Sequence, residues 1–107
     1  MRLSFAALLS LLISPALAHD GTYMGVGGVT CSEWILRGAS MPTKLEQEGW
    51  IFGYASGVNA ASPTDFLLKA DSVAMLLFVD TWCAKNPDKK LVEAANELLS
   101  VLKDKSR

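Results

Sequence analysis

The sequence has one histidine, His19, and it stands near the start of the chain, outside any pattern that predicts a folded segment. A serine or cysteine nucleophile activated by histidine, and a histidine-bound metal, each need an imidazole in the folded body. The glycines lie within a helical pattern and not between a strand and a helix, so no phosphate-binding loop is expected. We therefore predict no catalytic residues, no metal, no cofactor and no enzyme activity. A hydrolase that uses carboxylates alone is the alternative, although no pair stands out.

The chain also lacks a surplus of basic residues. Beyond residue 18 it carries nine lysines and arginines against eleven aspartates and glutamates. Nucleic-acid binding needs clustered positive charge to neutralise phosphates. We therefore expect no nucleic-acid partner.

After residue 18 there is no apolar run long enough to cross a membrane. Before it, Arg2 is followed by an apolar run from Phe5 to Ile13 and then by Ala16-Leu17-Ala18. A positive start, a short apolar core and a small-residue site are typical of a secretory signal peptide. We predict that residues 1–18 are this peptide, with cleavage after Ala18. An uncleaved membrane anchor is the alternative.

Only two cysteines are present, Cys31 and Cys83. In an exported chain such a pair predicts a disulfide. The two cysteines are 52 positions apart. In the chain-entropy description, a disulfide that closes a loop of that length disfavours the unfolded state by about 4 kcal/mol. Two free thiols or two metal ligands are the alternatives, but no histidine or third cysteine is near to complete a metal site.

Residues 19–29 hold four glycines without periodicity, which predicts a flexible lead-in. An N-terminal His19 is able to chelate copper, but there is no second histidine to complete the site. Residues 30–107 are expected to form a single domain.

Four helices are expected in that domain, which makes the fold class all-α, a small disulfide-tied bundle. The first begins at Thr30, whose spacing to Glu33 is that of a capping box, turns Trp34, Ile35 and Leu36 inward and ends at Gly38. The second begins near Pro42, with Thr43 and Glu46 at the same spacing. The third follows Asp71 as its cap and ends near Asn86, and the last begins at Asn86-Pro87. The last helix has an apolar stripe: Leu91, Ala94, Ala95, Leu98, Leu99 and Leu102.

Three features of the middle helices need an explanation. The stretch 73–83 is apolar nearly all round, which predicts a central helix covered on most sides. Gly49, Gly53 and Gly57 lie along one side of the second helix, where we expect another backbone to rest against them; an exposed docking strip is the alternative. Asp80 interrupts the apolar stretch. If it is paired when ionised, acid would break the pair and loosen the fold, whereas a partly exposed aspartate near a helix end is the simpler interpretation.

Several short motifs together resemble the HdeA-type acid-stress chaperones. They are Thr30-Cys31 followed by Trp34, the aromatic and glycine pattern from Trp50 to Gly57, Phe78-Val79-Asp80 followed by Cys83, and Asn86-Pro87. The resemblance implies a small helical periplasmic protein, dimeric at neutral pH, that opens in acid and binds unfolding proteins. It also implies that Cys31 and Cys83 are the family's disulfide. Asp80 is the candidate pH-sensing residue because of its place in the apolar stretch, and not because of the resemblance. The apolar surface for clients or for a dimer would come from Trp34, Trp50, Phe52, Met75, Leu76 and Phe78.

The pattern from Trp50 to Gly57 also resembles the Rap/Tai-type immunity proteins. That resemblance implies a different function, in which a small periplasmic protein binds and blocks one secreted toxin enzyme at neutral pH.

Overall fold

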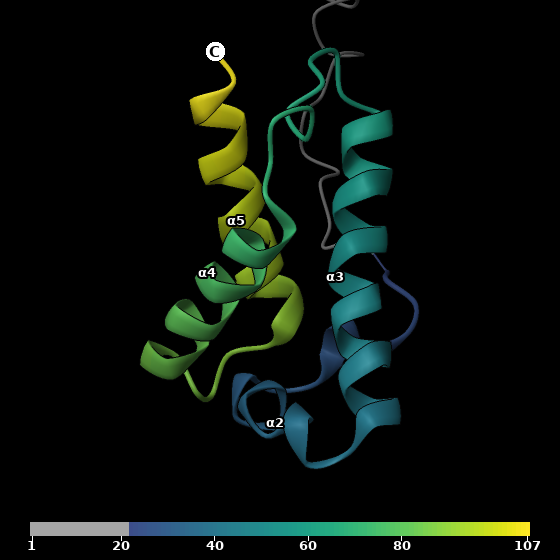
Figure 1. The fold of residues 1–107 in the computed structure, drawn as a ribbon, viewed down its shortest axis with the longest axis vertical. Coiled ribbons are helices and arrows are strands. Elements are labelled where there is room, and N and C mark those ends of the chain that lie inside the picture. The colour runs from purple at the N-terminus through teal and green to yellow at the C-terminus, as the bar shows by residue number, and fades with distance from the viewer. Residues whose placement is uncertain (1–21) are drawn as a thin grey trace, which may run out of the picture.

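The computed structural model describes residues 22–107 and contains four α-helices (Figure 1). They are α2 (Cys31–Ile35), α3 (Met41–Ala60), α4 (Ser72–Lys85) and α5 (Leu91–Lys105), with short 3-10 helices at Val26–Gly28 (η1) and Arg37–Ala39 (η2). Within this range there is no strand, only an isolated bridge between Thr30 and Lys90. The prediction of an all-α, disulfide-tied bundle is confirmed. The proposed signal peptide, its cleavage after Ala18, and His19 lie outside the described residues.

The Thr30 capping box is present, since Thr30 and Glu33 each accept a hydrogen bond from the other's backbone N–H. The helix it begins is shorter than predicted. α2 ends at Ile35, and Gly38 lies inside η2. Trp34 is buried, whereas Ile35 and Leu36 are exposed, so only one of the three expected inward residues points into the core.

The predicted start of the last helix at Asn86-Pro87 is wrong by about five residues. α5 begins at Leu91, and the segment before it pairs with the chain around the start of α2. Cys31 N donates to Lys89 O at 2.7 Å, and Leu91 N donates to Val29 O at 2.8 Å. These bonds satisfy backbone groups that a continued helix would have used internally. The segment instead forms a turn, in which Lys89 N donates to Asn86 O at 3.1 Å, and its backbone is extended at Lys90.

The predicted Thr43 cap is also wrong. α3 begins at Met41, after Ser40, and Pro42 lies in its first turn, where its missing N–H is harmless. The three glycines of α3, at 49, 53 and 57, are exposed, and a Cβ added at any of them would meet no atom within 4 Å. Within the described residues, no other backbone rests against this side of the helix, which overturns the expected close approach.

Asp71 caps α4 as predicted, accepting from the N–H groups of Val73 and Ala74, and the helix ends at Lys85, before Pro87. The expectation that other elements surround it is wrong. Met75, Val79 and Cys83 are buried, but Val73 is 62% exposed and Leu77 58% exposed. In the part of the chain that the structure describes, the other elements cover only one face of α4.

The apolar stripe of α5 is confirmed, because its first five members are buried and Leu102 packs against them. The core joins this stripe to residues of the other three helices, with Phe66 of the connecting loop closing one end. Asn59 holds that loop by accepting hydrogen bonds from the N–H groups of Phe66 and Leu67.

Candidate functional site

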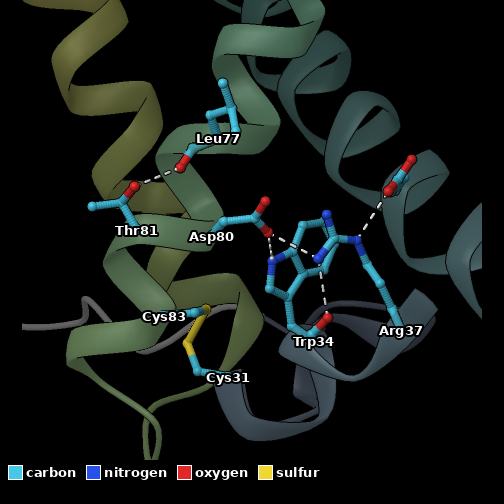
Figure 2. A network of polar contacts seen from close by, with 8 residues as sticks. Cys31, Trp34, Arg37, Leu77, Asp80, Thr81 and Cys83 are labelled. Atoms are coloured by element: carbon cyan, nitrogen blue, oxygen red, sulfur yellow. Dashed lines mark hydrogen bonds and ion pairs between the residues drawn. A yellow bond between two sulfur atoms is a disulfide. The ribbon is translucent and has the colours of Figure 1, made fainter. Parts of the chain in front are cut away.

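The disulfide between Cys31 and Cys83 joins α2 to α4 with their Cα atoms 4.8 Å apart. Trp34 lies three residues after one cysteine, and Asp80 lies three residues before the other. Each is therefore about one helical turn from the crosslink, and the two side chains meet beside it (Figure 2). The disulfide predicted from the cysteine count is confirmed, and it fixes which residues of α2 and α4 face each other.

Asp80 is the acceptor at the centre of a polar network. Its Oδ1 atom accepts from Trp34 Nε1 at 2.8 Å and from Arg37 Nη1 at 2.8 Å. Arg37 also donates from Nε to Glu48 Oε2 at 2.9 Å and from Nη1 to the carbonyl oxygen of Trp34 at 3.1 Å. Its guanidinium carbon lies 3.8 Å from the centroid of the Trp34 ring, in a cation–π contact. Four residues from η2, α2, α3 and α4 therefore act as one unit.

One positive charge thus lies between two carboxylates, over an indole that is fully buried. The side chains of Arg37 and Glu48 are 13% and 16% exposed, whereas that of Asp80 is 39% exposed. Solvent weakens the pair at Asp80 more than the pair at Glu48, since exposed pairs are screened. The arrangement fastens η2 to α3 and α4. The ion pairs that hold the network together exist only while the carboxylates of Glu48 and Asp80 are ionised.

The six residues predicted as client or dimer surface lie in or against the core. Trp34 and Met75 are buried members, and the others are half-buried and packed against it: Trp50, Phe52, Leu76 and Phe78. None of the six is among the large exposed apolar side chains. In the folded state they therefore contribute little accessible apolar surface.

Other apolar side chains are exposed instead. The sequence reasoning missed Leu36 at 70%, together with the pairs Met41 and Leu45 on α3 and Val73 and Leu77 on α4. Residues four apart share a helix face. The spacing of these pairs was visible in the sequence. It did not show which face would be left uncovered, because α4 is apolar nearly all round and α3 mixes apolar and polar residues on every side.

Within residues 22–107, no three histidine, cysteine, aspartate or glutamate side chains are grouped so that they could hold a metal ion. None of the helices in that part of the chain is both long enough and apolar enough to cross a bilayer.

Comparison with known proteins adds no relative: no family description, curated protein or solved structure matches this chain.

Proposed function

We propose that this protein is a periplasmic holdase of the acid-stress type, which binds unfolding proteins through apolar surface that becomes accessible at low pH. The observation that carries the proposal is the Arg37 network, in which two carboxylates hold η2 across the buried Trp34. A fold fastened by carboxylates next to buried apolar side chains has a means of loosening in acid.

The charge of the chain supports the same conclusion. Both ion pairs of Arg37 require an ionised carboxylate, and carboxylates as a class lose their charge in strong acid. The eleven acidic residues then no longer balance nine lysines and arginines beyond residue 18. Mutual repulsion favours an expanded state, and high net charge keeps such a state soluble while apolar surface is exposed.

Several of the exposed apolar residues lie on segments that the network holds. Leu36 directly precedes Arg37, and Met41 and Leu45 lie in the first turns of α3, before Glu48. Release of η2 would add Trp34 to this exposed set. Clients would then meet one enlarged apolar region at this end of the protein.

Light scattering of an enzyme that aggregates at about pH 2–3 tests the proposal. The oxidised protein should suppress aggregation in acid and have little effect at neutral pH. Full aggregation in acid with the protein in molar excess would contradict it.

A matched pair of double variants tests whether the network is the trigger. Asp80→Asn with Glu48→Gln removes both negative charges and keeps both side-chain shapes. Asp88→Asn with Glu97→Gln makes the same charge change at two exposed positions for which the structure shows no ion pair within the described residues. Binding of an apolar dye should begin at a less acidic pH in the first variant only. If the pH at which dye binding begins shifts equally in both double variants, the overall charge of the protein, and not the network, controls the opening.

The proposal includes a homodimer at neutral pH, which sedimentation velocity measures directly. The expected result is a dimer near pH 7 that dissociates as the pH falls to about 3. A monomer across this range would remove the dimer from the proposal and leave the client-binding test unaffected.

A second candidate function is immunity against a secreted toxin enzyme. It is favoured by the outer face of α4, where Val73 and Leu77 are exposed while the fold is intact, so that a partner could dock without any opening. Two results together would favour this function over the first. The protein would bind one secreted enzyme tightly at neutral pH and lose that binding in the double variant Val73→Asp with Leu77→Asp, and it would give no protection to clients in acid.

A further inference from the structure

The chain that precedes α2 is packed as a strap against α3, where a flexible lead-in was expected. We define the strap as residues 22–28. Trp50 of α3 donates from Nε1 to the carbonyl oxygen of Met24 at 2.7 Å. The ring of Tyr23 meets the Trp50 ring edge-on, with centroids 6.4 Å apart and planes at 70°. The strap is therefore held by both a hydrogen bond and an aromatic contact.

Two glycines allow this close approach. Gly25 has φ +84°, and a Cβ there would lie 2.9 Å from Trp50 Cδ1. Gly27 is buried, and a Cβ there would come closer still, against the six-membered part of the indole. Larger residues would push the strap away from α3. Gly25 and Gly27 are thus fitted to Trp50, in contrast to the open glycines of α3.

A cleft of about 610 Å³ lies between the strap, α3 and the beginning of α5. This volume falls within the range of roughly 300–1,000 Å³ that small-molecule sites occupy. The side chains that line it and can form hydrogen bonds are Thr22, Tyr23, Tyr54, Lys90, Glu93 and Asn96.

The aromatic wall of the cleft is fixed in position. The Tyr54 ring stacks on Trp50, with centroids 4.9 Å apart and planes at 10°. Its hydroxyl donates to Asn96 Oδ1 at 2.7 Å, so the side-chain amide of Asn96 is held as well. The amide nitrogen of Asn96 carries two further donors. Glu93 uses Oε2 to accept from Lys90 N at 2.9 Å, which leaves its other carboxylate oxygen as an acceptor.

We propose that this cleft binds a neutral carbohydrate, one or two pyranose rings of a glycan. A pyranose has C–H groups on its ring faces and hydroxyls around its edge, which match phenol rings beside donors and acceptors. The single positive charge of Lys90 and the single negative charge of Glu93 balance, so the cleft favours neither an anion nor a cation. A purely apolar ligand would bury the polar groups of Glu93 and Asn96 without partners, which is unfavourable.

An NMR titration of the oxidised, ¹⁵N-labelled protein at neutral pH tests this inference. The probes are chitotetraose and cellotetraose, two neutral oligosaccharides with and without N-acetyl groups. At least one should bind saturably, with a Kd of about 1 mM or tighter. The shifted signals should cluster at Tyr23, Tyr54 and Asn96. No saturable binding of either probe, or shifts centred elsewhere, would overturn the assignment.

Glycine variants supply a matched control. Gly27→Ala should displace the strap and weaken binding at least about tenfold, whereas Gly49→Ala, whose Cβ meets open space, should leave it unchanged. If Gly27→Ala fails to fold, Tyr23→Ala removes one wall of the cleft outside the core and should give the same loss. Undiminished binding in the strap variant that folds would overturn the inference. Because the measurement uses the folded protein at neutral pH, its outcome is separate from that of the chaperone test.

Discussion

Substitutions of Asp80 should separate the loss of its charge from the loss of its hydrogen bonds. Asp80→Ala leaves the Trp34 N–H without an acceptor in a fully buried position, which is unfavourable by roughly 1–3 kcal/mol. Loss of the half-exposed pair with Arg37 adds at most about 1 kcal/mol. Alanine gains a few tenths of a kcal/mol in helix propensity. We expect Asp80→Ala to lower the free energy of unfolding by about 2 kcal/mol.

Asp80→Asn keeps an oxygen that can accept from both Trp34 and Arg37, and it removes only the charge. Its expected effect at neutral pH is about 0.5 kcal/mol. Urea denaturation of the oxidised protein, followed by circular dichroism, measures both values, and the dependence on urea should be the same in both variants because the same surface is exposed on unfolding.

A double-mutant cycle with Trp34→Phe tests the reasoning directly. Phenylalanine has no N–H to leave unpaired, so the effect of Asp80→Ala should fall below about 1 kcal/mol in that background. Equal effects of Asp80→Asn and Asp80→Ala, or an unchanged effect of Asp80→Ala in the Trp34→Phe background, would refute the idea that the indole hydrogen bond is what Asp80 contributes.

Three further predictions concern stability. Replacing Cys31 and Cys83 together by serine should lower the free energy of unfolding by about 4 kcal/mol, because the bond closes a separation of 52 residues; urea denaturation that shows less than about 1 kcal/mol would contradict this. Val79→Ala should lower the free energy of unfolding by about 2 kcal/mol in the same assay, because Val79 is fully buried, whereas Val73→Ala on the exposed face of α4 should change it little. Equal effects of the two substitutions would mean that α4 turns a different face to the core. Asp71→Ala should lower stability by about 1 kcal/mol through loss of the α4 cap, and a thermal midpoint equal to that of the parent would argue against the cap.

The features that the sequence predicted well are those set by neighbouring residues. The capping box of Thr30 and Glu33, the Asp71 cap and the stripe from Leu91 to Leu102 depend on spacings within two or three helical turns. The pairing of Cys31 with Cys83 needed only a count, since two cysteines allow one bond.

The features that the sequence did not predict depend on distant segments. Asn86-Pro87 carries a helix-start signal, but hydrogen bonds with the chain around the start of α2 hold the following residues in a turn that leads to the bridge at Lys90. Gly25 and Gly27 gain their role only once Trp50 lies against them. The apolar composition of α4 gave no information about which face would lack a covering element.

Asp80 shows the same limit within the candidate site. Its isolation in an apolar stretch marked it as a residue with a role, and the structure gives it two hydrogen-bond donors. Arg37 and Glu48 were not singled out, because nothing in the local sequence brings an arginine after α2 and a glutamate of α3 together beside Asp80.

The sulfur–sulfur bond has a consequence for any expanded form of this protein. It ties the start of α2 to the last turn of α4, so that these two segments cannot drift apart even when the side chains between them separate. The expanded chain would remain a closed ring with two free arms, and the return to the compact form would begin from an already correct alignment of Trp34 with Asp80.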